Sequence, residues 1–281
     1  MNTTLTLNRG DAGRRAASLG RLGIWTLITS GLLIIFVPLL LTVYLSLFDE
    51  KLILFPPPGY TLSWYAAILP NFGGAIVVSL ELALSSVVGS LLLGVPAGIA
   101  LSRHRFRGVS VISTLLLAPL TIPGIALGLA IFLFLVLIET STSWPLTGSL
   151  LGLILSHLVI TLPWVVRLSV ASLINHDRAA EEAATSLGAR PLTVIWRVTL
   201  PAMRSGIVAA GLFAFIFSFG NLEMALFLVA PGVTTLPVAI LEYLEYHIDP
   251  LVASVAVAQM VLVGGLMLIL DRFVRIGKVV R

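Results

Sequence analysis

The chain has 281 residues, of which 58% are hydrophobic and only 11% are charged, and its mean hydropathy is +1.07. Soluble globular proteins are roughly a quarter charged and about half apolar, and a soluble chain of this length could not hide so much apolar material in one core. The composition therefore excludes a soluble protein, and the absence of cysteine excludes disulfides and thiolate metal sites.

The amino-terminal part combines a basic tail with a long uncharged run. Residues 1–21 carry four arginines, whereas residues 22–48 carry no charge. The run is longer than the apolar region of a cleavable signal peptide, so we expect a transmembrane helix that is retained. Residues 49–73 contain a Pro-Pro-Pro-Gly turn followed by aromatic residues, which predicts a periplasmic loop with an interfacial segment.

Five further apolar segments follow. Crossing the hydrocarbon core takes about 20 predominantly apolar residues. The segments that meet this length are 74–101, 110–138, about 146–166, about 205–228 and 250–270. The sequence therefore predicts an all-α integral membrane protein with six transmembrane helices, in which residues 74–271 form a five-helix core. A partly apolar stretch, 231–249, is too short to cross and predicts a re-entrant or interfacial helix.

The basic residues predict the orientation. Six spans place both termini on one side, and every one of the 17 Lys and Arg residues except Lys51 falls in the tails and loops of that side. The positive-inside rule then places the tails 1–21 and 272–281 in the cytoplasm. This distribution explains the pI of about 9.8, and no contiguous basic face of a soluble element favours nucleic acid.

The predicted cytoplasmic loop 175–201 has the pattern of a capped short helix. Asp177 can cap a helix whose first turns carry Glu181 and Glu182, where carboxylates suit the helix macrodipole. Gly188 is placed for a left-handed C-cap. A narrow apolar face at helical spacing is formed by Ala180, Ala183, Ala184 and Leu187.

A second short helix follows the bend. Pro191 is placed as its first residue, and Pro201 is expected to limit it. A bent pair of helices with one small-residue face can dock into a groove of a partner protein. An ordinary amphipathic cytosolic loop would carry the same alanines and the same glycine cap, so the pattern alone leaves both interpretations open.

This loop resembles the signature of a known family. The matching positions are Glu182, Ala183, Ala184, Gly188, Val198, Leu200 and Pro201. Their spacing, before the penultimate span, resembles the EAA motif of permeases in binding-protein-dependent ABC importers, with Val198 where isoleucine is usual. The resemblance covers roughly residues 74–270 and implies the type I ABC importer permease fold, with this loop as the cytoplasmic coupling helix. It also implies that Glu182 and Gly188 transmit closure of the ATPase dimer to the membrane helices.

The resemblance implies the partners as well. They are a dimer of ATP-binding subunits, a second permease subunit in a heterodimer, and a periplasmic solute-binding protein, assembled at the bacterial inner membrane. A P-loop needs a Gly-Lys-Ser/Thr sequence, and the only lysines are Lys51 and Lys278 in other contexts. We therefore expect a transport subunit that is no enzyme and holds no cofactor, with ATP and Mg on the partner ATPase.

Polar and helix-breaking residues inside two spans mark a candidate translocation path. The candidates are Pro119 and Pro123 in the third span and Ser218, Asn221 and Glu223 in the fifth. Prolines free backbone carbonyls that must find other partners or a wet cavity, and broken helices often mark transport sites. An ionisable group at membrane depth costs about 3 kcal/mol on insertion scales. A packing kink and an interfacial carboxylate are the alternative interpretations.

Other polar residues within spans favour helix packing. Ser85 and Gly89 follow Glu81 on one face of the second span, a spacing typical of small residues at helix contacts. His157 in the fourth span has no second ligand at metal spacing, so we expect a hydrogen-bonded packing residue.

The segments 217–219 and 231–238 resemble the spermidine/putrescine-type branch of the family, which also includes transporters of aminophosphonates. Permeases of that branch usually carry acidic residues directly after the Ser-Phe pair, where this chain has Gly220 and Asn221 and places its acid at Glu223. The expected substrate is a small polar or charged solute, polyamine-like or aminophosphonate-like, moved by alternating access.

Two other classes of protein are compatible with this composition. An ion-coupled secondary transporter without an ATPase would carry paired ionisable residues inside spans and inverted repeats, and Glu223 is isolated. A membrane hydrolase would need a motif such as HExxH or GxSxG, which the sequence lacks.

Overall fold

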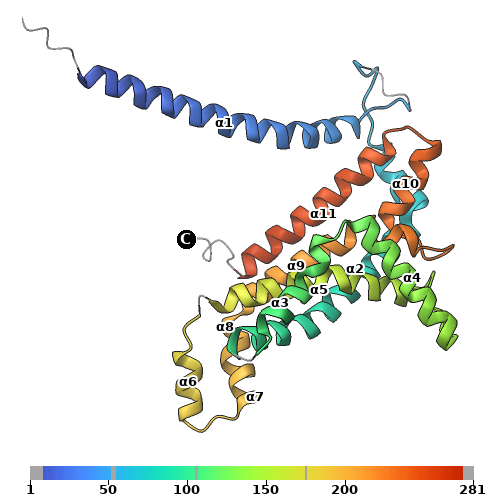
Figure 1. Ribbon diagram of the computed structural model, residues 1–281. Helices are drawn as coiled ribbons and strands as arrows, with labels where there is room; N and C mark the ends of the chain where they lie inside the picture. Colours follow the sequence, from blue (N-terminus) through green and yellow to red (C-terminus); the bar gives the residue numbers. More distant parts are fainter. Residues whose placement is uncertain (1–8, 52–54, 105–106, 175, 275–281) are drawn as a thin grey trace, which may run out of the picture. The chain divides into compact units, whose positions relative to one another are not determined.

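The computed structural model describes residues 9–51, 55–104, 107–174 and 176–274 (Figure 1). Within these ranges the chain is helical apart from its loops and two isolated bridges, Phe48 with Tyr60 and Ala230 with Val233. The chain divides into two compact units, residues 1–65 with 248–257 and residues 66–247 with 258–281.

The first unit contains α1 (Arg9–Leu45) and the loop after it. The helix begins inside the predicted tail 1–21 and ends before residue 48, and its part Gly23–Leu45 is long and apolar enough to cross a membrane. The loop is tied down by hydrogen bonds from Trp64 Nε1 to the Phe48 carbonyl (2.7 Å) and between Ser46 Oγ and the Tyr65 hydroxyl (2.7 Å).

The helix α2 (Ser63–Arg103) is longer than the predicted span 74–101. Its first turns occupy the end of the predicted loop 49–73, so that the loop closes at residue 62. Ile68 and Phe72 are buried in these turns, and burial of apolar side chains extends the helix through Pro70 despite the local turn composition.

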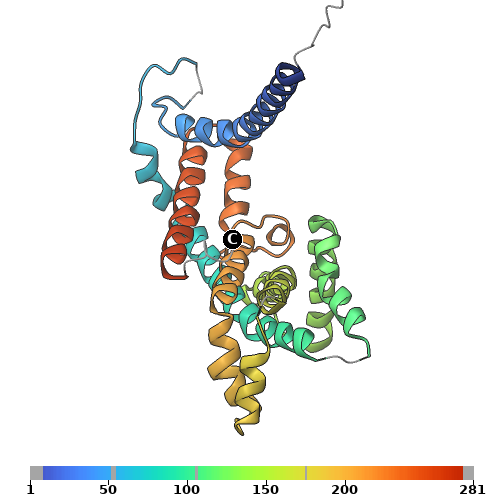
Figure 2. The same cartoon turned by 90° about the vertical axis from the view of Figure 1, so that its left-hand side faces the viewer.

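The third predicted span is broken. It consists of α3 (Val109–Leu117), a 3-10 turn η1 (Ala118–Thr121) and α4 (Gly124–Thr142). Ile122, between the two helical parts, is extended with φ −90° and ψ 136°, as expected for a residue that precedes a proline. Figure 2 shows α3 and α4 as separate limbs, drawn in green. The third predicted span is therefore a broken helix, one of the two interpretations that the sequence left open.

The next two spans differ from prediction at their ends. The helix α5 (Leu150–Ile174) continues well beyond residue 166, because Ser169 and Leu173 are buried along its extension. The helix α9 (Arg204–Phe219) ends at Gly220, short of the predicted limit at residue 228. A short 3-10 turn, η3 (Ala225–Phe227), follows it.

The last elements match their predicted positions. The helix α10 (Leu236–Tyr246) is the expected short helix in the stretch 231–249, and α11 (Leu251–Val274) corresponds to the sixth span. The backbone N–H of Leu236 donates to Ser79 Oγ on α2 over 2.7 Å, which fixes the start of α10.

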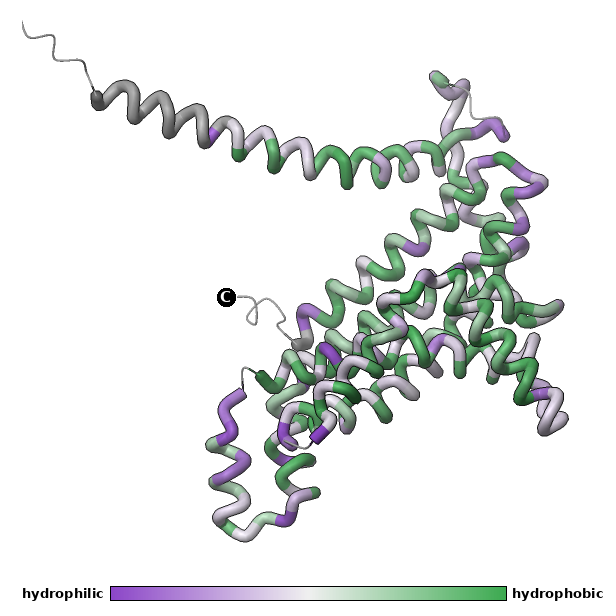
Figure 3. The backbone as a smooth tube through the Cα atoms, in the orientation of Figure 1, coloured by the Kyte–Doolittle hydropathy of each residue, from purple (hydrophilic) through white to green (hydrophobic). Residues whose placement is uncertain are grey.

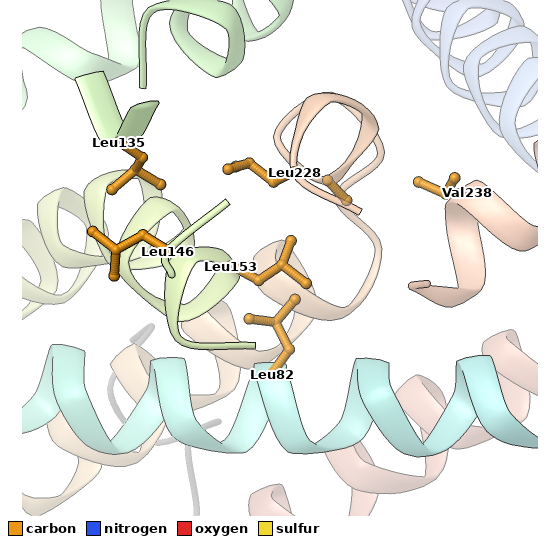
Figure 4. Close-up of a cluster of buried hydrophobic side chains, with 7 residues drawn as sticks. Leu82, Leu135, Leu146, Leu153, Leu228 and Val238 are labelled. Carbon is orange, nitrogen blue, oxygen red and sulfur yellow. The ribbon is translucent and has the colours of Figure 1, made fainter. Parts of the chain in front are cut away.

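The second unit has its apolar core between α2, α4, α5 and the segment after α9. Figure 4 shows six of the seven buried side chains of one cluster by name. The cluster comprises Leu82, Leu135, Leu146, Leu153, Ala225, Leu228 and Val238. A second cluster comprises Val95, Val165, Leu173, Met203, Ala210 and Ala214, so α2 and α5 contribute to both.

Small residues allow α2 and α5 to approach closely. A Cβ at Gly94 would lie 2.8 Å from Val165 Cγ1, and a Cβ at Gly98 would lie 2.5 Å from Ser169 Cβ. Such spacing of small residues is typical of helix contacts in membranes.

Length and apolarity qualify five described helices as membrane spans, or six when the bent pair Pro191–Ala202 and Arg204–Phe219 is counted as one. Figure 3 shows hydrophobic residues along these helices and hydrophilic ones gathered on α6 (Ala179–Ser186). The predicted all-α membrane fold is confirmed, with five or six spans among the described residues.

Candidate functional site

The segment 176–203, here called the hairpin, contains every residue of the predicted coupling motif. Its first arm is α6, and its second arm is α7 (Pro191–Val194), η2 (Ile195–Thr199) and α8 (Leu200–Ala202). Figures 1 and 2 show α6 and α7 side by side, projecting beyond the end of α5.

Local chemistry shapes the first arm as the sequence predicts. Asp177 Oδ1 accepts a hydrogen bond from the Ala179 N–H over 3.0 Å at the start of α6. At the other end Gly188 has a φ of +85°, and its N–H donates to the Thr185 carbonyl (2.9 Å). The Ala189 N–H donates to the Ala184 carbonyl (3.0 Å), which completes a Schellman motif. The bend is therefore a hydrogen-bonded turn that favours glycine.

The second arm differs from prediction at its end. Pro191 is the first residue of α7, as expected, but the helix continues through Pro201 to Ala202. Residues 195–199 are π-helical, with the Leu200 N–H bonded to the Ile195 carbonyl. This wider turn precedes Pro201, whose ring clashes with the carbonyl four residues earlier in a regular α-helix. The helix axis then turns by 72° between 191–202 and α9.

Polar contacts join the base of the hairpin to the end of α2. Arg103 Nη2 lies 3.0 Å from Glu181 Oε1, and the same oxygen accepts a hydrogen bond from Thr199 Oγ1 over 3.0 Å. Arg178 Nη2 donates to the Ser102 carbonyl over 2.7 Å. From the sequence, Arg103 is only one of the basic residues that indicate orientation, and Glu181 is only a carboxylate that suits the macrodipole at the start of a helix. No sequence signal pairs two residues 78 positions apart.

The predicted coupling residues fall into two groups. Glu182, Ala183, Gly188 and Pro201 are exposed, and Leu187 beside them is 88% exposed. The other three, Ala184, Val198 and Leu200, are half-buried. The exposed side chains of the hairpin thus include a glutamate, small residues and the large apolar side chains of Leu187, Leu192 and Trp196.

Two hollows lie where the hairpin meets α2. One of about 520 Å³ has the charged residues Arg103, Glu181 and Glu182 among its lining residues. An apolar one of about 590 Å³ has Val95, Ile99, Leu192, Trp196 and Leu200 among its lining residues.

The breaks in the third and fifth spans lie together. A Cβ at Gly124, the first residue of α4, would overlap the Glu223 carboxylate, and one at Gly128 would lie 2.8 Å from the Glu223 carbonyl oxygen. Glu223 therefore lies in the turn after α9, exposed, and packs against the amino-terminal turns of α4. Asn221 precedes it and accepts a hydrogen bond at Oδ1 from the Met224 N–H over 2.9 Å.

Of the other candidate path residues, only Pro123 lies in this region. Pro123 is exposed directly before Gly124, whereas Pro119 is half-buried in η1. Ser218 is buried, and its Oγ lies 2.9 Å from Nδ1 of the fully buried His157. This contact confirms His157 as a hydrogen-bonded packing residue. The structure thus brings Pro123, Asn221 and Glu223 to one region and directs Ser218 into the α5–α9 contact.

Comparisons with known sequences match the membrane core. Residues 90–276 match the family described as binding-protein-dependent transport system inner membrane component. The putrescine transport system permease protein PotI of Escherichia coli (strain K12) is 31% identical over 229 residues, 80% of this chain and 81% of that protein. The molybdenum transport system permease protein ModB of Mycobacterium bovis is 34% identical over 220 residues, 74% of this chain and 81% of that protein.

Solved structures share the fold. A bacterial ABC transporter involved in the import of the acidic polysaccharide alginate has a chain that superposes with a TM-score of 0.65 at 18% identity, covering 96% of this chain and 99% of the other. A chain of the inward-facing MetNI methionine ABC transporter gives a TM-score of 0.61 at 23% identity, covering 74% and 96%. With the family match over most of its length, the chain belongs to the binding-protein-dependent transport system inner membrane components, the permease subunits of ABC importers.

Proposed function

We propose that this chain moves a small polar or charged solute from a periplasmic binding protein into the cytoplasm by alternating access, driven by a separate ATPase. The observation that carries this proposal is the hairpin, which projects from the core and exposes Leu187 beside Glu182. We assign to it the role of coupling helix.

The form of the hairpin suits a mechanical role. Its bend is held by the two hydrogen bonds of the Schellman motif, and its base is tied to α2 through Glu181 and Arg178. Because both the bend and the base of the hairpin are fixed, a displacement imposed by the ATPase would move the hairpin as a rigid unit. The ATPase would hold ATP and Mg, and its closure would favour the outward-facing state by binding the hairpin differently in the two states.

The orientation follows from the proposed role. An ATPase of the cytosol can reach the hairpin only if residues 176–203 and both termini lie on the cytoplasmic side. The distribution of basic residues supports this placement, because only Lys51 lies on the opposite side.

A second permease subunit completes the path. Glu223 and Pro123 are exposed on this chain, and a carboxylate at membrane depth must face protein or water rather than lipid. We place the second subunit, a distinct chain in a heterodimer, opposite this region. The translocation path would then pass Pro123, Asn221 and Glu223, with Pro119 and Ser218 supporting it from behind.

The substrate we propose is a polyamine-like cation, with an aminophosphonate-like solute as the alternative. The relative PotI is named for putrescine transport. Glu223 also contributes the only charge between residues 205 and 228, so the predicted fifth span offers a cation one carboxylate.

Reconstitution tests the proposal. The chain would be purified with its second permease subunit and ATPase, inserted into liposomes, and supplied with binding protein and labelled putrescine. We expect uptake that requires both ATP and the binding protein. Uptake driven by an ion gradient without the ATPase would instead identify a secondary transporter.

A further inference from the structure

We propose that Arg103 and Glu181 form a latch that positions the hairpin against α2, so that motion of the hairpin is carried into the membrane core. The inference rests on the proposed function, since it assigns a role to residues that the coupling motif does not include. Glu181 stands one position before that motif, and Arg103 is the last residue of α2.

One carboxylate oxygen joins three elements. Glu181 Oε1, in the first turns of α6, lies 3.0 Å from Arg103 Nη2 at the end of α2 and 3.0 Å from Thr199 Oγ1 in the π-helical turn. Both arms of the hairpin and α2 therefore meet at a single atom. Loss of the negative charge at this atom would weaken the contacts that hold the three elements together.

A second contact fixes the angle of the joint. Arg178 Nη2 donates to the Ser102 carbonyl over 2.7 Å, so each of the two elements contributes one arginine to the other. A single contact would allow α6 to pivot about it. Two contacts, at residues 102 and 103 of α2 and at 178 and 181 of the hairpin, oppose that rotation.

The latch is sheltered from solvent. The side chains of Arg103 and Glu181 are only 13% and 19% exposed. Exposed ion pairs contribute little because water and salt screen them, whereas partly buried pairs are screened much less. The Arg103 Nε is buried without a hydrogen-bond partner among the described residues, whereas Nη2 of this guanidinium donates to Glu181.

The helix that receives the latch reaches the core. α2 contributes Val95 to the cluster nearer the hairpin and Leu82 to the cluster nearer α4 and α10. A displacement of Arg103 would therefore be transmitted through α2 to both clusters, because close-packed interiors transmit strain.

Adjacent glutamates thus have separate roles. Glu181 faces inward and holds the hairpin to its own chain, whereas Glu182 is exposed and is available to the partner ATPase. Neutralising each of them in turn should therefore give different defects.

The test compares Glu181→Gln with its matched neighbour Glu182→Gln in the complete transporter, together with the charge exchange Arg103→Glu plus Glu181→Arg. Three quantities are measured: the ATPase retained on purification, ATP hydrolysis stimulated by loaded binding protein, and putrescine taken up per ATP. We expect Glu181→Gln to retain the ATPase but to lower uptake per ATP about tenfold, within the usual range of coupling between sites. Glu182→Gln should instead lower ATPase retention.

The charge exchange separates positioning from simple stability. It restores the ion pair with reversed sign, so we expect it to recover most of the uptake per ATP. Wild-type uptake per ATP in Glu181→Gln, or an exchange variant as impaired as Glu181→Gln, would overturn the latch. Failure of the unaltered chain to retain any ATPase would overturn the proposed function instead.

Discussion

The carboxylate of Glu223 lies against the α-carbon of Gly124, so close that a methyl group on Gly124 would overlap it. Glu223 follows the end of α9, and Gly124 begins α4 after the break at Pro123. A negative charge near a helix amino terminus is stabilised by the macrodipole. The end of α9 and the break before α4, which are far apart in the sequence, therefore together place the Glu223 carboxylate beside the amino terminus of α4.

Substitution of Gly124 by alanine should displace the Glu223 carboxylate. We expect Gly124→Ala to lower putrescine uptake about tenfold, which corresponds to about 1.4 kcal/mol. Uptake in reconstituted liposomes measures the effect. Gly265→Ala is the matched control, because a Cβ there meets nothing within 4 Å.

A double-mutant cycle shows whether Gly124 acts through Glu223. The single change Glu223→Gln should lower uptake by a similar factor, and Gly124→Ala should add little in that background, since contacting residues are not additive. Equal additional losses in both backgrounds would contradict the proposed path.

The bend of the hairpin depends on a backbone conformation that few residues adopt. At Gly188, with φ +85°, a side chain would have open space, so only the left-handed conformation opposes a substitution. Gly188→Val should strain the turn by about 1–3 kcal/mol and uncouple ATP hydrolysis from uptake while the protein still inserts.

Gly232 provides the control for that prediction. It has φ +83° and the same open space, but it lies in the predicted outer segment. Gly232→Val introduces the same strain and should leave hydrolysis coupled to uptake. Full coupling in the Gly188→Val protein would contradict the assigned role of the hairpin.

The buried pair of His157 and Ser218 should contribute to stability rather than to selectivity. Ser218→Ala removes the oxygen 2.9 Å from His157 Nδ1. Since the buried Nε2 has no partner among the described residues, both ring nitrogens would then be unpaired, and the loss costs about 1–3 kcal/mol. We expect a lower thermal unfolding temperature in detergent and an unchanged ratio of uptake between putrescine and spermidine. Ser141→Ala, on an exposed serine, should leave the unfolding temperature unchanged.

Close approach of α2 and α5 makes Gly98 sensitive to size. A Cβ at this position would lie 2.5 Å from Ser169 Cβ and 3.3 Å from the Val166 carbonyl oxygen, so Gly98→Leu would separate the helices. We expect loss of folded protein in size-exclusion chromatography. Gly264→Leu, where a Cβ meets nothing within 4 Å, should remain folded.

Features set by neighbouring residues were predictable from the sequence. Asp177 accepts a hydrogen bond from the first residue of α6, Gly188 follows the helix in a left-handed conformation, and Pro191 begins the next helix, because each depends on a few adjacent residues. The number of spans followed from apolar length in the same way.

Features set by packing were not predictable. α2 begins early because Ile68 and Phe72 are buried, and α9 stops at Gly220 although apolar residues continue. The contact between Arg103 and Glu181 depends on how distant segments fold together. The helix continues through Pro201 because of a π-helical turn, which no residue pattern in the sequence predicts.

Cross-linking from the tip of the hairpin tests the central claim most directly. The chain contains no cysteine, so Leu187→Cys would place a single thiol at an 88% exposed position, and Trp144→Cys, at 67% exposed, provides a control in a predicted outer segment. We expect a thiol cross-linker to join Leu187→Cys to the ATP-binding subunit, and Trp144→Cys to give no such product. Labelling of Leu187→Cys from outside intact cells by a membrane-impermeant reagent would contradict a hairpin that receives the cytoplasmic ATPase.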